Sequence, residues 1–203
     1  MCIQDMICWC CGVAVVGLVA TFATFGDEPA ALATPAKVEL LLTGDDSEVA
    51  EAGHHLIAGK EEWTALWARH LGPESIDPET GEVSPAAPEV DFDTQLIVAV
   101  FIGRGSTSYG LKLVSYTSEG DELSIRYLNR SYQTTVSSRL DSEEAKLEWE
   151  ERYGHVSAYG FFLLPRDVRE IVLFQDSRGM GQTVPKWTER ARFTPPGMEP
   201  AER

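Results

Sequence analysis

Alternation of apolar and polar positions dominates the second half of the chain and predicts a sheet-rich domain. The apolar run LIVAVFI at 96–102 is too short to span a membrane and indicates a central strand buried on both faces. Two alternating segments follow at 111–117 and 122–128, and the Ser-Glu-Gly-Asp between them predicts a hairpin turn. Further strands are expected at 38–42, 158–165, 169–174 and 187–193, with a weakly patterned one at 54–58.

Two segments show helical periodicity instead. In 60–71 (KEEWTALWARHL), two tryptophans, a leucine and His70 recur at i, i+3, i+4 and i+7, which is one face of a helix. Acidic residues open this segment and basic residues close it, as the helix dipole favours, and a Gly-Pro pair ends it. The segment 141–154 (DSEEAKLEWEERYG) begins with capping-box spacing and ends in glycine. We therefore predict an α+β fold, a single domain dominated by an antiparallel β-sheet with two short helices.

The first 26 residues form an apolar segment of another kind. From Met6 to Phe25 about 20 uncharged residues follow one another, enough to cross a hydrocarbon core as a helix. We expect an N-terminal apolar helix at 1–26 that is either a cleaved signal peptide or a membrane anchor, and either would make the domain extracytoplasmic, secreted or membrane-anchored. A signal peptide should begin with positive charge, but the charge that precedes the run is Asp5.

The remaining boundaries follow from composition. A linker of proline, alanine and acidic residues is expected at 27–36, the folded domain at 37–194 and a flexible tail at 195–203. The domain holds no cysteine, so it must be stable without a disulfide. The chain's four cysteines, Cys2, Cys8, Cys10 and Cys11, all lie in the first eleven residues. A soft-metal cluster of Cys8, Cys10 and Cys11 would need a fourth ligand and accessible thiolates, so small apolar residues of a membrane segment explain these three better.

The charge of the chain limits its partners. It holds 32 acidic and 17 basic residues, a formal net charge of −15. Such a surface repels polyanions instead of releasing their counterions, so we expect no nucleic-acid partner. The carboxylates of 72–93 are a calcium alternative, but their spacing matches no EF-hand loop. We expect neither a metal nor a cofactor.

The stretch FIGRGSTSYG at 101–110 is the part of the chain that most resembles a catalytic or phosphate-binding loop. Its glycines and hydroxyls suggest a phosphate cradle, but such a cradle needs amide groups at a helix N-terminus, and the residues after Gly105 alternate like a strand. Ser106 to Gly110 also approaches the Gly-x-Ser-x-Gly elbow of esterases, which again requires a helix after its nucleophile. The histidines fit packing or surface positions better than the role of a base; they are His54, His55, His70 and His155. We therefore expect no catalytic residue.

A longer stretch, VDFDTQLIVAVFIGRGSTSYGLKLVSYTSEGDELSIRY at 90–127, resembles the core of the PrcB C-terminal domain family. The likeness rests on an Asp-Phe pair, an apolar strand ending in Gly103, a small-residue turn at 106–109 and the hairpin after it. The helix at 60–71 and the segment AYGFFLLPR resemble the flanking parts of that domain, so the likeness covers about 61–166. One departure is Ser108, which stands where the family has a glycine directly before the tyrosine.

The resemblance implies a role in binding. The family is viewed as a non-catalytic extracytoplasmic domain and is named after a subunit of a secreted bacterial protease complex. It implies an exported or membrane-tethered accessory domain whose partner is another envelope protein, such as a protease. The membrane itself is a further partner if the N-terminal segment is uncleaved. The candidate binding loop is Gly103, Arg104, Gly105, Ser106, Thr107, Ser108, Tyr109 and Gly110.

Three alternatives remain open at this point. In the first, Tyr109 belongs to the core and the glycines of the loop only turn the chain. In the second, the protein is a hydrolase that uses a serine of 106–108. In the third, it is a purely structural protein of the bacterial envelope.

Overall fold

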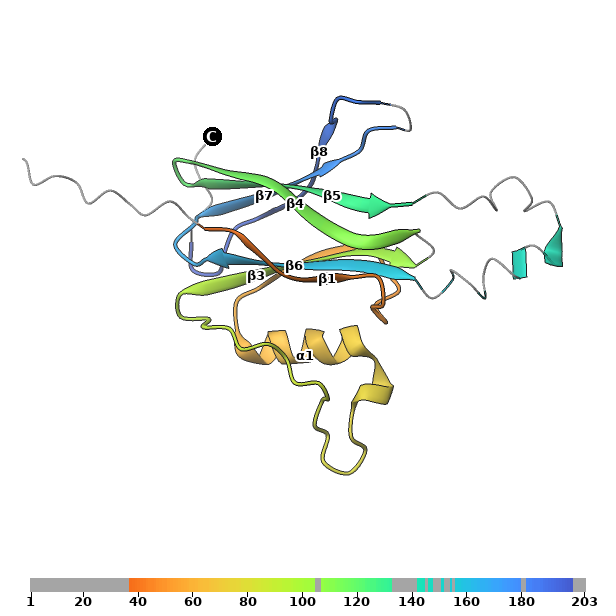
Figure 1. Ribbon diagram of the computed structural model, residues 1–203. Coiled ribbons are helices and arrows are strands. Elements are labelled where there is room, and N and C mark those ends of the chain that lie inside the picture. Colours follow the sequence, from red (N-terminus) through yellow and green to blue (C-terminus); the bar gives the residue numbers. More distant parts are fainter. Residues whose placement is uncertain are drawn as a thin grey trace, which may run out of the picture. The chain divides into compact units, whose positions relative to one another are not determined.

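Strand pairing builds two four-stranded sheets from the described part of the chain (Figure 1). The computed structural model describes residues 37–104, 107–132, 142–144, 146, 147, 151, 154, 156–179 and 182–198, which all belong to one compact unit, Pro35–Arg203. The first sheet has the strand order β1-β6-β3-β2 and the second the order β4-β5-β7-β8. The strands are β1 (Glu39–Gly44), β2 (Gly53–Ile57), β3 (Gln95–Arg104), β4 (Ser108–Glu119), β5 (Glu122–Ser131), β6 (Ser157–Pro165), β7 (Glu170–Asp176) and β8 (Trp187–Phe193).

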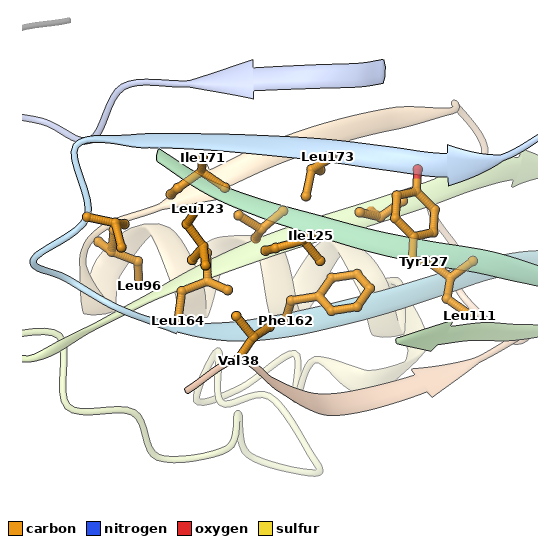
Figure 2. Close-up of a cluster of buried hydrophobic side chains, with 13 residues drawn as sticks. Val38, Leu96, Leu111, Leu123, Ile125, Tyr127, Phe162, Leu164, Ile171 and Leu173 are labelled. Carbon is orange, nitrogen blue, oxygen red and sulfur yellow. The ribbon is translucent and has the colours of Figure 1, made fainter. Parts of the chain in front are cut away.

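A helix and the two sheets form three layers. Helix α1 (Lys60–Leu71) covers the outer face of the first sheet, while the second sheet packs on its inner face (Figure 1). A short 3-10 turn, η1 (Pro73–Ser75), follows the helix. Figure 2 shows the core between the sheets, where Leu123 and Ile125 of β5 point towards Leu164 and Phe162 of β6.

The central position of β3 follows from its composition. Residues 96–101 of this strand are fully buried, because α1 covers one face and the second sheet covers the other. Leu96, Val98 and Val100 point into the core between the sheets, whereas Ile97, Ala99 and Phe101 point towards the helix. A strand buried on both faces reads as a continuous apolar run. The prediction of such a strand is confirmed.

The predicted helix at 60–71 and every predicted strand are present, but the sheet arrangement differs from the prediction. The strands form two sheets, and β5 pairs with β7 in parallel, which makes the second sheet mixed. After β5 the chain enters the first sheet as β6, between β1 and β3, and then returns to the second sheet as β7. Strands joined by such a crossover can run in the same direction, whereas a hairpin requires opposite directions.

The expected second helix is described only in part. Glu143, Glu144, Lys146, Leu147 and Glu151 are helical, and the other residues predicted to belong to it are mostly outside the described residues. The N-terminal helix at 1–26, the linker at 27–36 and residues 199–203 of the tail are also outside them. Within the described ranges, no helix is long and apolar enough to cross a membrane.

The acidic segment between α1 and β3 is tied to the helix. The indole Nε1 of Trp63 donates a hydrogen bond of 2.9 Å to the carbonyl oxygen of Pro88, and that of Trp67 donates one of 2.8 Å to Pro85. A buried indole N–H requires such an acceptor. The Arg166 guanidinium donates to the carbonyl oxygens of Ala58 and Phe92, which joins the start of α1 to this segment. The segment is therefore partly packed, although its charged side chains are exposed.

Candidate functional site

The first two residues of the predicted binding loop are strand residues. Gly103 interrupts the regular register between β3 and β6 and has a φ of 88°. A Cβ at this glycine would lie 3.0 Å from the backbone nitrogen of Ala52, so the close approach of the two backbones requires glycine. Arg104 pairs with Glu48 at 3.0 Å and its N–H donates to the carbonyl oxygen of Ala50. Gly105 and Ser106 lie outside the described residues.

The hydroxyl groups of Thr107 and Ser108 are used inside the fold. Strand β4 begins at Ser108, which confirms that a strand follows this loop. Ser108 is fully buried; its Oγ accepts the N–H of Gly110 at 3.0 Å and bonds the side-chain oxygen of Asn129. The Thr107 hydroxyl donates to the carbonyl oxygen of Tyr132 at 2.8 Å. At Ser108 there is thus neither the helix N-terminus nor the exposed hydroxyl that an esterase elbow requires.

Gly110 closes one edge of the two-sheet sandwich. Its φ is 96°, and a Cβ there would lie 2.5 Å from Thr43 Oγ1 and 2.9 Å from the backbone nitrogen of Gly44. The Thr43 hydroxyl accepts the N–H of Leu111 and donates to the carbonyl oxygen of Tyr159 at 2.8 Å. Through this hydroxyl β1 contacts both β4 and β6. The glycine is therefore a structural requirement of the corner.

Tyr109 is exposed, so the alternative that places it in the core is wrong. Its exposed fraction is 58%, and its ring lies 4.4 Å from the ring of Tyr132, centroid to centroid. The β4–β5 register shifts between Ser108 and Leu111, a β-bulge that lets both of these residues point inwards. Local alternation does not show such a bulge, which turns Tyr109 to the outer face.

The outer face of the second sheet continues from this tyrosine pair. Along β5, alternate residues point into the core, so Arg126, Leu128 and Arg130 share the opposite face. Lys112 of β4 is the register partner of Leu128 and lies on the same face. We call the following residues the basic–aromatic face: Tyr109, Lys112, Arg126, Arg130, Tyr132, Phe174 and Trp187.

Arg126 occupies the centre of the basic–aromatic face. Its guanidinium carbon lies 5.9 Å from the ring centroid of Phe174 on β7 and 5.9 Å from that of Trp187 on β8. These distances are within the range of cation–π attraction. Its Nε is buried without a hydrogen-bond partner. Within the described ranges, no carboxylate forms an ion pair with Lys112, Arg126 or Arg130.

A cluster of one arginine and three glutamates lies beside the basic–aromatic face, towards the other end of the same sheet. Arg192 of β8 contacts Glu189, Glu170 and Glu122 at 3.0, 2.9 and 3.0 Å. The hydrogen bonds that Arg192 donates to these three carboxylates, Glu189 first, raise its pKa. Glu122 and Glu170 lie at the far end of their strands, whereas Glu189 is the register partner of Phe174 and so borders the basic–aromatic face.

A buried serine–histidine contact lies elsewhere, near the end of α1. Nδ1 of His70 is 3.0 Å from Ser47 Oγ, and both residues are almost completely buried. The same Ser47 Oγ accepts the N–H of Val49. Burial lowers the pKa of His70, against the opposing effect of Asp46. Sequence patterning placed His70 on the packed face of a helix, which is confirmed, but gave no sign of Ser47 as its partner.

A cleft of about 990 Å³ lies between α1 and the acidic segment. The residues that line it include the acidic Glu82, Glu89 and Asp91 as well as Trp63 and Trp67. Both tryptophans are almost completely buried, so the cleft offers little aromatic surface to a ligand. In the part of the chain that the structure describes, no three His, Cys, Asp or Glu side chains are grouped as metal ligands.

Sequence reasoning missed most of the basic–aromatic face. The outward positions of 111–117 and 122–128 can be read from their alternation, and they include Lys112 and Arg126. Their proximity to Phe174 and Trp187 depends on the parallel pairing of β5 with β7, which no local pattern indicates.

No family model, curated protein or solved structure matches this chain. Membership of the PrcB C-terminal domain family therefore stays a prediction from the residues quoted above.

Proposed function

We propose that this protein is a non-catalytic binding domain, exported or tethered to the membrane, that assists or regulates another protein of the bacterial envelope, such as a protease. The observation that carries the proposal is the exposed Tyr109 ring, packed against Tyr132 at the start of β4 and the end of β5. The location outside the cytoplasm rests on the apolar segment at 6–25.

The tyrosine pair has the properties of a recognition site. A tyrosine has few rotatable bonds, so it loses little conformational entropy when it binds, and it offers both apolar area and a hydroxyl. Hydrogen bonds between Thr107 and Tyr132 hold the two strand ends together beneath the rings. The rings are thus held in place before a partner arrives, which lowers the entropic cost of association.

The hydroxyl groups of the loop favour binding over catalysis. A nucleophile must be accessible and must have a base within hydrogen-bond reach. The Ser108 hydroxyl is buried and bonded to Asn129 and Gly110. The Ser47–His70 pair is buried as well, and its serine oxygen accepts a hydrogen bond from the N–H of Val49.

Affinity capture from envelope fractions tests the proposal. We expect the full chain to retain a discrete envelope protein. The Tyr109→Ala variant should retain at least about tenfold less of that protein, because an exposed aromatic anchor contributes strongly to binding. Tyr116→Ala is the matched control, because Tyr116 is also an exposed tyrosine of β4, with an exposed fraction of 37%. Equal retention by the wild type and both variants would refute a binding role for the corner.

A serine-directed covalent probe tests the hydrolase alternative. We expect no labelling of the full chain, because the binding proposal uses no activated serine. Labelling that disappears in Ser106→Ala or Ser108→Ala would favour the hydrolase instead. A purely structural envelope protein predicts neither labelling nor a retained partner.

A further inference from the structure

Three cations on one sheet face lack acidic partners in a strongly acidic protein. The chain carries a net charge of −15, yet Lys112, Arg126 and Arg130 form no ion pair with any carboxylate of the described residues. Arg104, Arg169, Arg178 and Arg192 do form such pairs. An unpaired cluster of one sign beside the exposed Tyr109 ring and other partly exposed rings is the composition of a surface that binds the opposite sign.

The positions of the three cations define a spacing. Arg126 and Arg130 are four residues apart on the same face of β5, and Lys112 is the register partner of Leu128, midway between them. At about 3.4 Å per residue, the cations follow one another along the strand at intervals of roughly 7 Å. An extended peptide repeats its side chains on one face at the same interval, because alternate residues point the same way.

We infer that the basic–aromatic face binds an extended segment of a partner protein that carries carboxylates at alternate positions. The inference rests on the proposed function and specifies the chemistry of the partner. The carboxylates lie over Arg126, Lys112 and Arg130, while apolar groups of the segment pack on the Tyr109–Tyr132 pair. No element of the described residues covers this face, whereas α1 covers the outer face of the first sheet (Figure 1).

Arg126 is the central contact in this arrangement. The rings of Phe174 and Trp187 hold its guanidinium in place. An arginine fixed by stacking loses less conformational freedom when it forms a bidentate bond with a carboxylate. Because its Nε is already buried without a partner, a carboxylate on the guanidinium would stabilise a charge that is partly shielded from water.

Carboxylates beside the face also limit where the segment lies. Glu122, Glu170 and Glu189 share one arginine, and Glu189 is the register partner of Phe174, so it borders the basic–aromatic face. Because these glutamates repel further carboxylates, the acidic segment lies on the side of them that contains Tyr109. A nucleic acid meets the same repulsion from the whole chain, with its net charge of −15, which favours a short acidic peptide over a long polyanion.

A synthetic peptide provides the test. The probe is a fluorescein-labelled Glu-Thr-Glu-Thr-Glu-Thr peptide, and its binding to the full chain is followed by fluorescence anisotropy. Its control, Glu-Glu-Glu-Thr-Thr-Thr, has the same composition without the alternation. We expect the alternating peptide to bind at least about threefold more tightly, because it can place one carboxylate over each cation, and to weaken as salt is added.

Charge-removing variants locate the binding. We expect Arg126→Gln to weaken the alternating peptide by about tenfold, and Lys112→Gln and Arg130→Gln by about two- to fivefold each, since exposed ion pairs are weaker than stacked bidentate ones. Lys60→Gln is the matched control, because it removes the same charge from the start of α1, in the other outer layer. If Arg126→Gln fails to fold, the exposed Lys112 and Arg130 variants still decide the outcome.

Other outcomes overturn the inference in recognisable ways. Equal binding of the two peptides, or unchanged binding by Lys112→Gln and Arg130→Gln, would refute it. Tighter binding of an oligodeoxythymidine of the same charge would assign the face to nucleic acid instead. The proposed function would survive either result if envelope capture still depended on Tyr109. The opposite combination is also possible: Tyr109→Ala leaves the captured amount unchanged, while peptide binding still requires the three cations. That result would refute the function proposed for the corner but would leave the inference of an acidic ligand standing.

Discussion

At the scale of single residues, two close approaches decide the shape of the candidate site. Gly103 lets β3 pass the backbone of Ala52, and Gly110 lets β4 pass Thr43 and Gly44. Both glycines have positive φ, a conformation that side chains with a Cβ rarely adopt. The corner therefore keeps its geometry through backbone contacts, and the exposed Tyr109 between them is free of that structural role.

Substitution of Gly110 tests this account. We expect Gly110→Ala to lower the free energy of unfolding by more than about 2 kcal/mol, because the new Cβ would overlap Thr43 Oγ1 and the positive φ adds strain. Gly120→Ala is the control: its φ is also positive, at 58°, but nothing lies within 4 Å of its Cβ position. There the expected loss is about 1 kcal/mol. Equal losses in urea unfolding would contradict the steric explanation.

The buried His70 and the half-buried His54 predict a pH dependence of stability. Burial lowers the pKa of His70, and burial followed by the charge of Arg190 lowers that of His54. Below about pH 6.5 the unfolded chain binds protons that the folded chain does not, so the free energy of unfolding falls as the pH drops. We expect His70→Gln to make this dependence shallower between neutral and mildly acidic pH. Urea titrations with an unchanged slope would exclude His70 as a source.

At the scale of secondary-structure elements, α1 is held to the first sheet by an aromatic cluster. The ring of Trp63 lies 5.1 Å from that of Phe161 on β6, and its indole N–H is bonded to the segment that leads into β3. The helix, the acidic segment and the sheet thus meet at one side chain. Burial of such rings contributes more to stability than the helix's own propensity does.

Replacement of Trp63 tests how the helix is held. We expect Trp63→Phe to lower the free energy of unfolding by about 2 kcal/mol, because the smaller ring leaves a void and the Pro88 carbonyl loses its donor. Thr64→Ala, on the exposed side of α1, should change it by less than about 0.5 kcal/mol. Urea unfolding followed by circular dichroism measures both. A Trp63→Phe effect no larger than that of the control would show that the indole does not hold the segment.

The positions of the helix and strands along the chain were largely predictable, but which strands pair with one another was not. Burial and alternation are properties of consecutive residues, so the run at 96–102 and the helix at 60–71 could be found from sequence. The parallel pairing of β5 with β7 depends on where β6 inserts, and that is decided by contacts between residues distant in the chain. The bulge that exposes Tyr109 was hidden for the same reason, because an extra residue in one strand is defined only against its partner.

At the scale of the whole molecule, the domain contains no covalent cross-link. The four cysteines lie in the first eleven residues, and residues 37–203 contain none. Two apolar clusters, one between the sheets and one beneath α1, stabilise the fold instead. A domain of this size buries enough apolar surface to fold without a disulfide.

Reducing agent should therefore leave the domain's stability unchanged. We expect the free energy of unfolding to agree within about 0.5 kcal/mol with and without dithiothreitol, since a structural disulfide would contribute about 2–5 kcal/mol. Urea unfolding of the same preparation under both conditions measures it. A loss of several kcal/mol on reduction would reveal a cross-link through the N-terminal cysteines.

The sequence by itself determined the elements, the absence of a disulfide from the domain and the acidic balance, since each follows from the identity of residues or from their local periodicity. It also favoured a strand after the glycine-rich loop, which argued against a phosphate cradle. Only the tertiary structure brought Thr43 to Leu111 and placed Arg126 between Phe174 and Trp187. The physical reason is that a binding face is a property of neighbouring strands, and strand pairing is chosen by the packing of the whole core.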